Sequence, residues 1–143
     1  MIKKHYLILV IIIISILYIF VRLAYFNNSL TTIEVDTKAY INIAKINIFE
    51  LGFWTGYKPV SYPLIIKLFN FNLDNVVYFQ FSLSIFAWIL FAFFFSRNIY
   101  SPIITSISYI FILLFSLSTD VILWDRILLT ESLNISIIVI FLA

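Results

Sequence analysis

The chain has 143 residues, of which 64% are hydrophobic and 11% charged, with a mean hydropathy of +1.11. An ordinary soluble domain has about 45–50% apolar and about 25% charged residues, so lipid must solvate part of this chain. The net charge is only +2 and the basic residues are scattered, which excludes a nucleic-acid-binding surface. The absence of cysteine excludes disulfides and thiolate chemistry, and a single histidine excludes multi-histidine metal sites.

Residues 6–26 open with an unbroken apolar run that predicts a first transmembrane helix. A signal peptide would have a shorter apolar core of about 7–15 residues and a small-residue cleavage site, so we expect no cleavage. Lys3 and Lys4 precede the run and favour a cytoplasmic N-terminus. Near the far end, Arg22 is expected to place its guanidinium among the lipid headgroups, with phosphate binding as the alternative.

Residues 27–74 form the longest polar interval and are predicted to be an outer loop. Between residues 33 and 49 there is no glycine or proline, and polar and apolar side chains fall on opposite stripes of a helix. This pattern predicts an amphipathic helix in the membrane interface. Residues 51–63 contain both glycines and two prolines and are expected to be loop, and 64–71 to form a second short interfacial helix.

Three further apolar runs are predicted to span the membrane, at about 75–95, 102–118 and 127–143. The fold class is therefore all-α integral membrane, with about four transmembrane helices. If the N-terminus is cytoplasmic, the polar intervals 27–74 and 119–126 both lie on the outer face. The last run reaches the end of the sequence without flanking polar residues, so we expect this chain to be the N-terminal part of a longer multi-pass domain.

Two stretches resemble a known superfamily. The first stretch is Asp36-x-x-x-Tyr40-x-x-x-Ala44, a glycine, and then Lys58-Pro59-x-x-Tyr62-Pro63. It resembles the first outer loop of the GT-C superfamily of membrane glycosyltransferases, which includes protein O-mannosyltransferases and lipid A aminoarabinose transferases. The second stretch, WDRILLTESL at 124–133, resembles the second outer loop of that superfamily running into its fourth helix. Many relatives have a proline and a glycine where this chain has Val60 and Ser61.

The resemblance implies transfer of a sugar from a polyprenyl-phosphate donor to an acceptor lipid, glycan or protein at the outer face. It implies that Asp36, with Glu34 beside it, acts as catalytic base or positions the acceptor. A carboxylate can take the proton of an attacking hydroxyl, and the leaving phosphate needs a cation nearby. Because the resemblance covers only the front of a typical relative, residues 1–143 alone are expected to be inactive.

Each candidate residue also has a plainer interpretation. Asp36 could simply stabilise a helix N-terminus, and the Glu34–Asp36 pair could bind a divalent cation or be solvated. Arg126 is the first candidate for holding the donor phosphate and Lys58 the second, whereas Asp125 and Arg126 could be only a surface pair. The remaining candidates for donor or acceptor binding are Tyr40, Tyr62 and Glu131. Glu131 interrupts an apolar run, which indicates either a functional role or a helix cap.

The competing class is a non-enzymatic membrane protein, such as a lipid flippase or a transporter subunit. Transporters usually place ionisable residues and broken helices near the bilayer midplane. In this sequence the carboxylates lie in or beside the polar intervals, and the runs at 75–95 and 102–118 carry no charged residue. These features favour the glycosyltransferase over the transporter.

Overall fold

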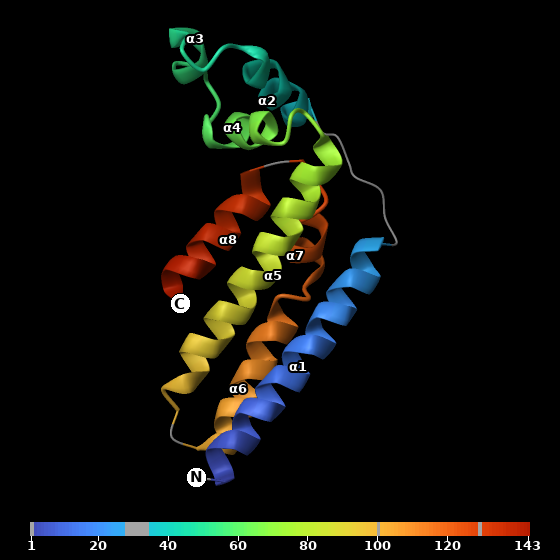
Figure 1. Cartoon of the computed structure of the whole chain (residues 1–143), viewed down its shortest axis with the longest axis vertical. Coiled ribbons are helices and arrows are strands. Elements are labelled where there is room, and N and C mark those ends of the chain that lie inside the picture. Colours follow the sequence, from blue (N-terminus) through green and yellow to red (C-terminus); the bar gives the residue numbers. More distant parts are fainter. Residues whose placement is uncertain (1, 28–34, 100, 129) are drawn as a thin grey trace.

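A computed structural model describes residues 2–27, 35–99, 101–128 and 130–143, and within them the side chains of all but residues 2–5, 27 and 35. All of the regular elements in these ranges are helices. Their order is α1 (Ile2–Asn27), α2 (Val35–Lys45), α3 (Leu51–Trp54), α4 (Ser61–Leu68), α5 (Leu73–Arg97), α6 (Pro102–Phe115), α7 (Thr119–Trp124) and α8 (Thr130–Leu142). Figure 1 shows a lower bundle of α1, α5, α6 and α8, and an upper layer of α2, α3 and α4.

Among the described residues, two helices are long and apolar enough to cross a membrane, namely Tyr6–Phe26 within α1 and the whole of α5. Only 11% of the most apolar window of α1 is buried inside the protein, so its large apolar side chains face outward. Water would solvate such a surface poorly, which supports association with a membrane. The other two expected spans are shorter than a bilayer needs: α6 has 14 residues and α8 has 13.

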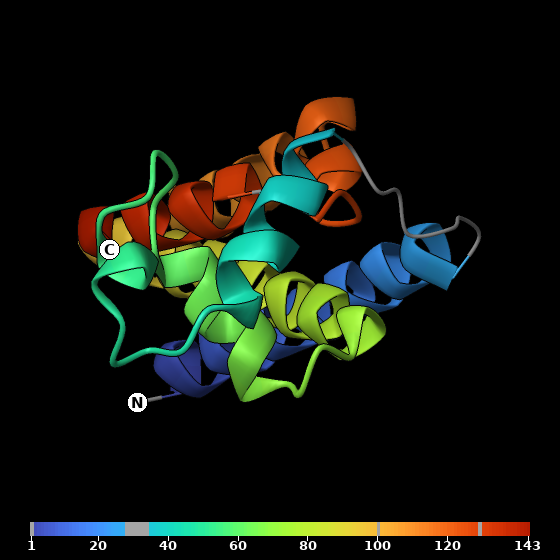
Figure 2. The same ribbon diagram turned by 90° about the horizontal axis from the view of Figure 1, so that it is seen from above.

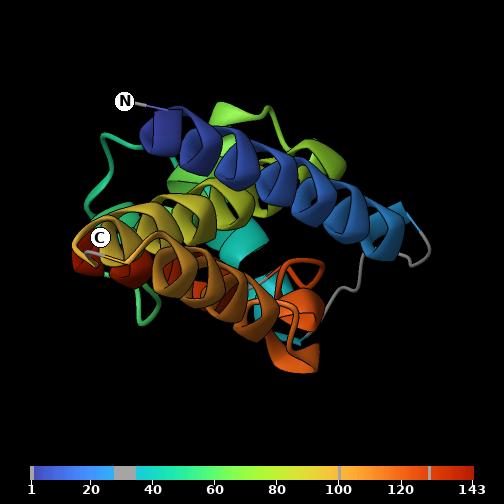
Figure 3. The same cartoon turned by 90° about the horizontal axis from the view of Figure 1, so that it is seen from below.

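The bundle is built around α5, which packs against α6 on one side and α8 on the other, while α1 lies alongside α5 and α6 (Figure 3). Helix α5 begins where Asn72 accepts a hydrogen bond from the backbone N–H of Asn75 at 3.1 Å, a helix N-cap. Small buried residues, Ala87 and Ala92, let the neighbouring helices approach α5 closely. The bundle core is completed by Tyr18, Trp88, Tyr109, Leu113, Val121 and Val139.

The upper layer lies across the N-terminal ends of α5 and α8 (Figures 1 and 2). Its core joins α2 and α4 to the bundle and consists of Tyr40, Ala44, Tyr62, Ile66, Val76, Val77, Leu128 and Leu133. The apolar face of α2 is therefore covered by protein. The packing partner of this face is α4, and the expected position of α2 in the membrane interface stays a prediction.

Helix α4 begins three residues earlier than the predicted 64–71. Pro63 lies in its first turn, where a missing N–H costs no intrahelical hydrogen bond. The helix ends in a turn where Asn70 and Phe71 have positive φ angles of 51° and 60°. There the N–H of Phe71 donates to the carbonyl of Ile66 at 3.0 Å, a Schellman-type end made without glycine.

Candidate functional site

Asp36 lies in the first turn of α2 and forms an ion pair with Lys58, which lies in the bend before α4. The Lys58 ammonium is 2.8 Å from the Asp36 carboxylate, and the two side chains are 21% and 54% exposed, respectively. The same ammonium lies 5.7 Å from the centre of the Tyr40 ring, a cation–π contact. The hydrogen bond to Asp36 raises the pKa of Lys58. The candidate base is thus accessible to solvent and has a cation beside it.

Two buried tyrosines join this pair to the bundle. The rings of Tyr40 and Tyr62 meet edge to face with their centres 5.1 Å apart. The Tyr62 hydroxyl donates a hydrogen bond to the side-chain oxygen of Gln80 on α5. Burial raises the pKa of Tyr62, and the nearby Tyr40 and Glu131 raise it further. Tyr62 is therefore protonated at neutral pH and acts as a hydrogen-bond donor.

Ile127, Leu128 and Thr130 are hydrogen-bonded to α2 and α5. Thr37 donates to the carbonyl of Leu128 at 2.8 Å, and the hydroxyls of Tyr40 and Thr130 are 3.3 Å apart. The side-chain amide of Gln80 donates to the carbonyl of Ile127 at 3.3 Å. These bonds bring the first turn of α8, which carries the exposed Glu131, close to α2 and α4.

Arg22 is 1% exposed and lies inside the bundle. It pairs with Asp125 and donates to the hydroxyl of Ser84 at 3.0 Å and to the carbonyl of Ser116 at 2.9 Å. Asp125 also accepts a hydrogen bond from Ser132 at 2.8 Å. The expectation that Arg22 reaches the headgroups is wrong, because α5, α6 and α7 supply partners inside the protein. The alternative that Asp125 and Arg126 form a surface pair is also wrong, since both are buried.

Arg126 is the buried cation that the described side chains leave unbalanced. It is 8% exposed, and neither its Nε nor its Nη2 has a hydrogen-bond partner. Its guanidinium lies 5.6 Å from the centre of the Phe26 ring and lines a narrow crevice with Arg22, Phe81 and Ile122. Burial lowers the pKa of Arg126, although a guanidinium stays protonated in proteins. Two guanidiniums and one carboxylate give this crevice an excess positive charge, although as it stands it is too narrow to hold a water molecule, so an anion would enter only if the crevice widened.

The divalent-cation interpretation of Glu34 and Asp36 is not tested, because Glu34 lies outside the described residues. Within the described ranges no group of three or more histidines, aspartates or glutamates is placed to hold a metal ion. The carboxylate of Asp36 is engaged by Lys58. The side chains that are described therefore do not by themselves make a metal site.

The structure brings together Asp36, Tyr40, Lys58, Tyr62 and Glu131 at the upper layer, with Asp125 and Arg126 in the bundle beneath. Sequence reasoning missed Gln80 as a connecting residue. A signal was present: Gln80 and Ser84 are polar, lie inside an apolar run and are spaced by four, so they share one helix face.

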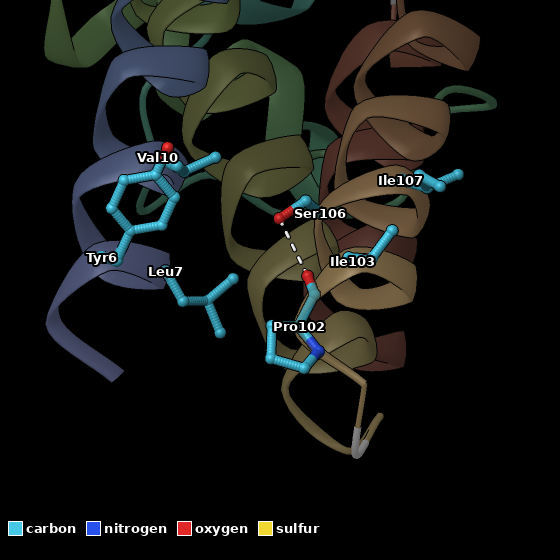
Figure 4. A pocket seen from close by; sticks show the side chains of 7 residues that line it. All are labelled: Tyr6, Leu7, Val10, Pro102, Ile103, Ser106 and Ile107. Atoms are coloured by element: carbon cyan, nitrogen blue, oxygen red, sulfur yellow. Dashed lines mark hydrogen bonds between the residues drawn. The ribbon is translucent and has the colours of Figure 1, made fainter. Parts of the chain in front are cut away.

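An apolar pocket at the other end of the bundle contains none of these residues. It lies between α1 and α6, with Tyr6 and Leu7 on one side and Ile103 and Ile107 on the other (Figure 4). Its polar member, Ser106, points its hydroxyl to the carbonyl of Pro102 at 3.0 Å. With no charged side chain in its lining, this pocket offers no acid–base chemistry.

Comparison of the chain with protein-family models, with curated proteins and with solved structures found no match. The residues and contacts described above are therefore what a functional proposal must be built on.

Proposed function

We propose that the protein is a glycosyltransferase, or the N-terminal part of one, that moves a sugar from a polyprenyl-phosphate donor to an acceptor at the outer membrane face. The single observation that carries this proposal is the position of Arg126. A buried guanidinium with excess positive charge lies in the segment that is hydrogen-bonded to α2, the helix that carries Asp36. A phosphate would balance the guanidinium, and a carboxylate close by can accept a proton.

The roles follow from the chemistry of the side chains. Asp36 takes the proton of the attacking acceptor hydroxyl as the bond to the anomeric carbon forms. Arg126 stabilises the negative charge that develops on the leaving phosphate. Lys58 is the second candidate for binding the donor phosphate. Its ammonium pairs with the Asp36 carboxylate and so lies next to the candidate base. Tyr40 and Tyr62 hold α2 and α4 in place, and Glu131 lies at the junction as an acceptor-binding group.

A lipid flippase or transporter subunit is the second candidate, and the buried Arg22–Asp125 pair is the observation in its favour. A transport path would need ionisable or broken-helix positions near the midplane. Between Asp74 and Arg97, α5 carries no charged side chain, and α6 carries none at all. Sugar transfer therefore explains the charged residues at the outer end better than transport does.

The test is an assay of sugar transfer from polyprenyl phosphate by the protein at its native length, with Asp36→Asn and Glu34→Gln as variants. Asparagine keeps the size of Asp36 but cannot accept a proton, so turnover should fall about 10²–10⁴-fold. Loss of a helix-dipole contact alone would cost less than about 1 kcal/mol of stability and little activity. A dead Glu34→Gln beside an active Asp36→Asn would move the base to Glu34, and full activity of both would refute the proposal.

A further inference from the structure

An exposed aromatic ring borders the candidate base. Tyr57 lies in the bend between α3 and α4, and its side chain is 81% exposed. The centre of its ring is 6.0 Å from the Lys58 ammonium, which is in turn 2.8 Å from the Asp36 carboxylate. Exposure alone does not set this ring apart, since Phe49 is 93% exposed, but Tyr57 lies beside the Lys58–Asp36 ion pair. Its position beside the ion pair therefore points to a ligand.

The ligand must cover an apolar ring and a charged pair at the same time. A hydrocarbon chain laid over Tyr57 would take water from Asp36 and Lys58 without replacing its hydrogen bonds, which is unfavourable. A pyranose sugar meets both demands. One of its faces is made of C–H groups that pack against an aromatic ring, and its hydroxyls can bond to a carboxylate and an ammonium.

We propose that Tyr57, Lys58 and Asp36 form a pyranose-binding subsite, with the Tyr57 ring as its platform. The subsite rests on the proposed function in one respect: only a glycosyltransferase has a donor and an acceptor to which the bound sugar could belong. In either case the sugar stacks on Tyr57 and turns a hydroxyl toward the ion pair. The ring of Tyr40, which is 4% exposed, also contacts the Lys58 ammonium, with its centre 5.7 Å away.

The test measures binding of methyl glucoside, methyl mannoside and methyl galactoside to the native-length protein in detergent micelles, by saturation-transfer difference NMR. At least one glycoside should bind, with the strongest saturation on its ring C–H protons. Tyr57→Ala should weaken that binding about two- to tenfold, whereas Tyr57→Phe should retain it. Phe49→Ala is the matched control, because Phe49 is 93% exposed in the same loop region. The Phe49→Ala variant should bind the glycoside as strongly as the unaltered protein does.

Three results would overturn the subsite: no glycoside binds, Tyr57→Ala binds like the unaltered protein, or Phe49→Ala loses as much as Tyr57→Ala. Adding the polyprenyl-phosphate-linked sugar shows whether the subsite binds the sugar of the donor or that of the acceptor. It displaces the glycoside if the subsite takes the donor's sugar, and binds together with it if the subsite takes the acceptor's. Glycoside binding without sugar transfer would refute the proposed function alone. Transfer with normal binding in Tyr57→Ala would refute the subsite alone.

Discussion

Arg22 and Arg126 line the same crevice, but their charges are balanced differently. Arg22 has a carboxylate, a hydroxyl and a carbonyl as partners, so its burial is compensated. Arg126 has no carboxylate within ion-pair distance among the described residues. A buried pair that loses one member leaves a costly unpaired charge, and a buried cation that has no partner already carries this desolvation cost.

The same substitution at the two arginines should therefore have different effects on stability. Arg22→Leu leaves Asp125 buried and unpaired and should lower the free energy of unfolding by about 3–5 kcal/mol. Arg126→Leu should be neutral or stabilising when no lipid is bound. Denaturant titration in mixed detergent micelles measures both changes. Equal losses in the two variants would mean that Arg126 has a partner in the unliganded protein.

The two candidates for the donor phosphate can be separated by kinetics. Arg126→Gln should raise the KM for the polyprenyl-phosphate donor about 10–100-fold, since hydrogen bonds to charged groups contribute about 1.5–3 kcal/mol. Lys58→Gln should raise it less, because Lys58 is solvent-accessible and already paired with Asp36. The measurement is steady-state transfer at varied donor concentration. A larger effect at Lys58 would reverse the assignment.

At the scale of the elements, the upper layer is held by side chains that bond to each other and to the backbone carbonyls of Ile127 and Leu128. Gln80 is central, because its amide joins Tyr62 on α4 to Ile127 beneath it. An amide buried in an apolar helix is stable there only while its hydrogen bonds are made. The upper layer should thus unfold together with the residues bonded to it, Ile127 and Leu128.

Tyr62→Phe tests this unit. The variant leaves the Gln80 oxygen buried without its donor and should lower the free energy of unfolding by about 1–3 kcal/mol. Amide hydrogen exchange should rise in 125–131 as well as in α4. The double variant Tyr62→Phe/Gln80→Leu should cost less than the sum of the single variants, since the two residues share one interaction. If the losses of stability in the two single variants simply add up in the double variant, Tyr62 and Gln80 do not share an interaction.

Part of this arrangement could be predicted from sequence, and the physical reasons for the rest are specific. The apolar runs at 6–26 and 75–95 predicted α1 and α5, and the polar–apolar stripes predicted α2. Periodicity shows which face of α2 is apolar but not what covers it, so packing by α4 was missed. The short helices α3 and α7 were missed because each is too brief for a periodic signal. The partner of Arg22 could not be predicted, as nothing local links residues 103 positions apart.

At the scale of the whole molecule, the charged and aromatic groups of the candidate site gather at the end of the bundle opposite the N-terminus (Figure 1). The C-terminal end of α5, which carries Arg97, lies at the same end as the beginning of α1. If α1 and α5 cross a membrane, the site faces one compartment and that end of α5 the other.

Cysteine labelling tests this orientation, because the sequence contains no cysteine of its own. Single cysteines at Ser61 and Ser118 should react with a membrane-impermeant reagent in intact cells, and one at Asn98 should not. All three positions are exposed in the fold, so a lack of reaction reports the side of the membrane. Labelling at Asn98 alone would invert the orientation and place the site in the cytoplasm.

The Arg22–Asp125 pair also has a consequence for synthesis of the protein. At about 5–20 residues per second, the ribosome takes roughly 5–20 s to add the 103 residues that separate the two partners. For that time the first helix carries an arginine whose carboxylate does not yet exist. If α1 crosses a membrane, the Arg22 side chain needs other partners, such as lipid headgroups, until the later helices arrive. The Arg22–Asp125 pair, which is buried in the finished protein, can thus form only late in synthesis.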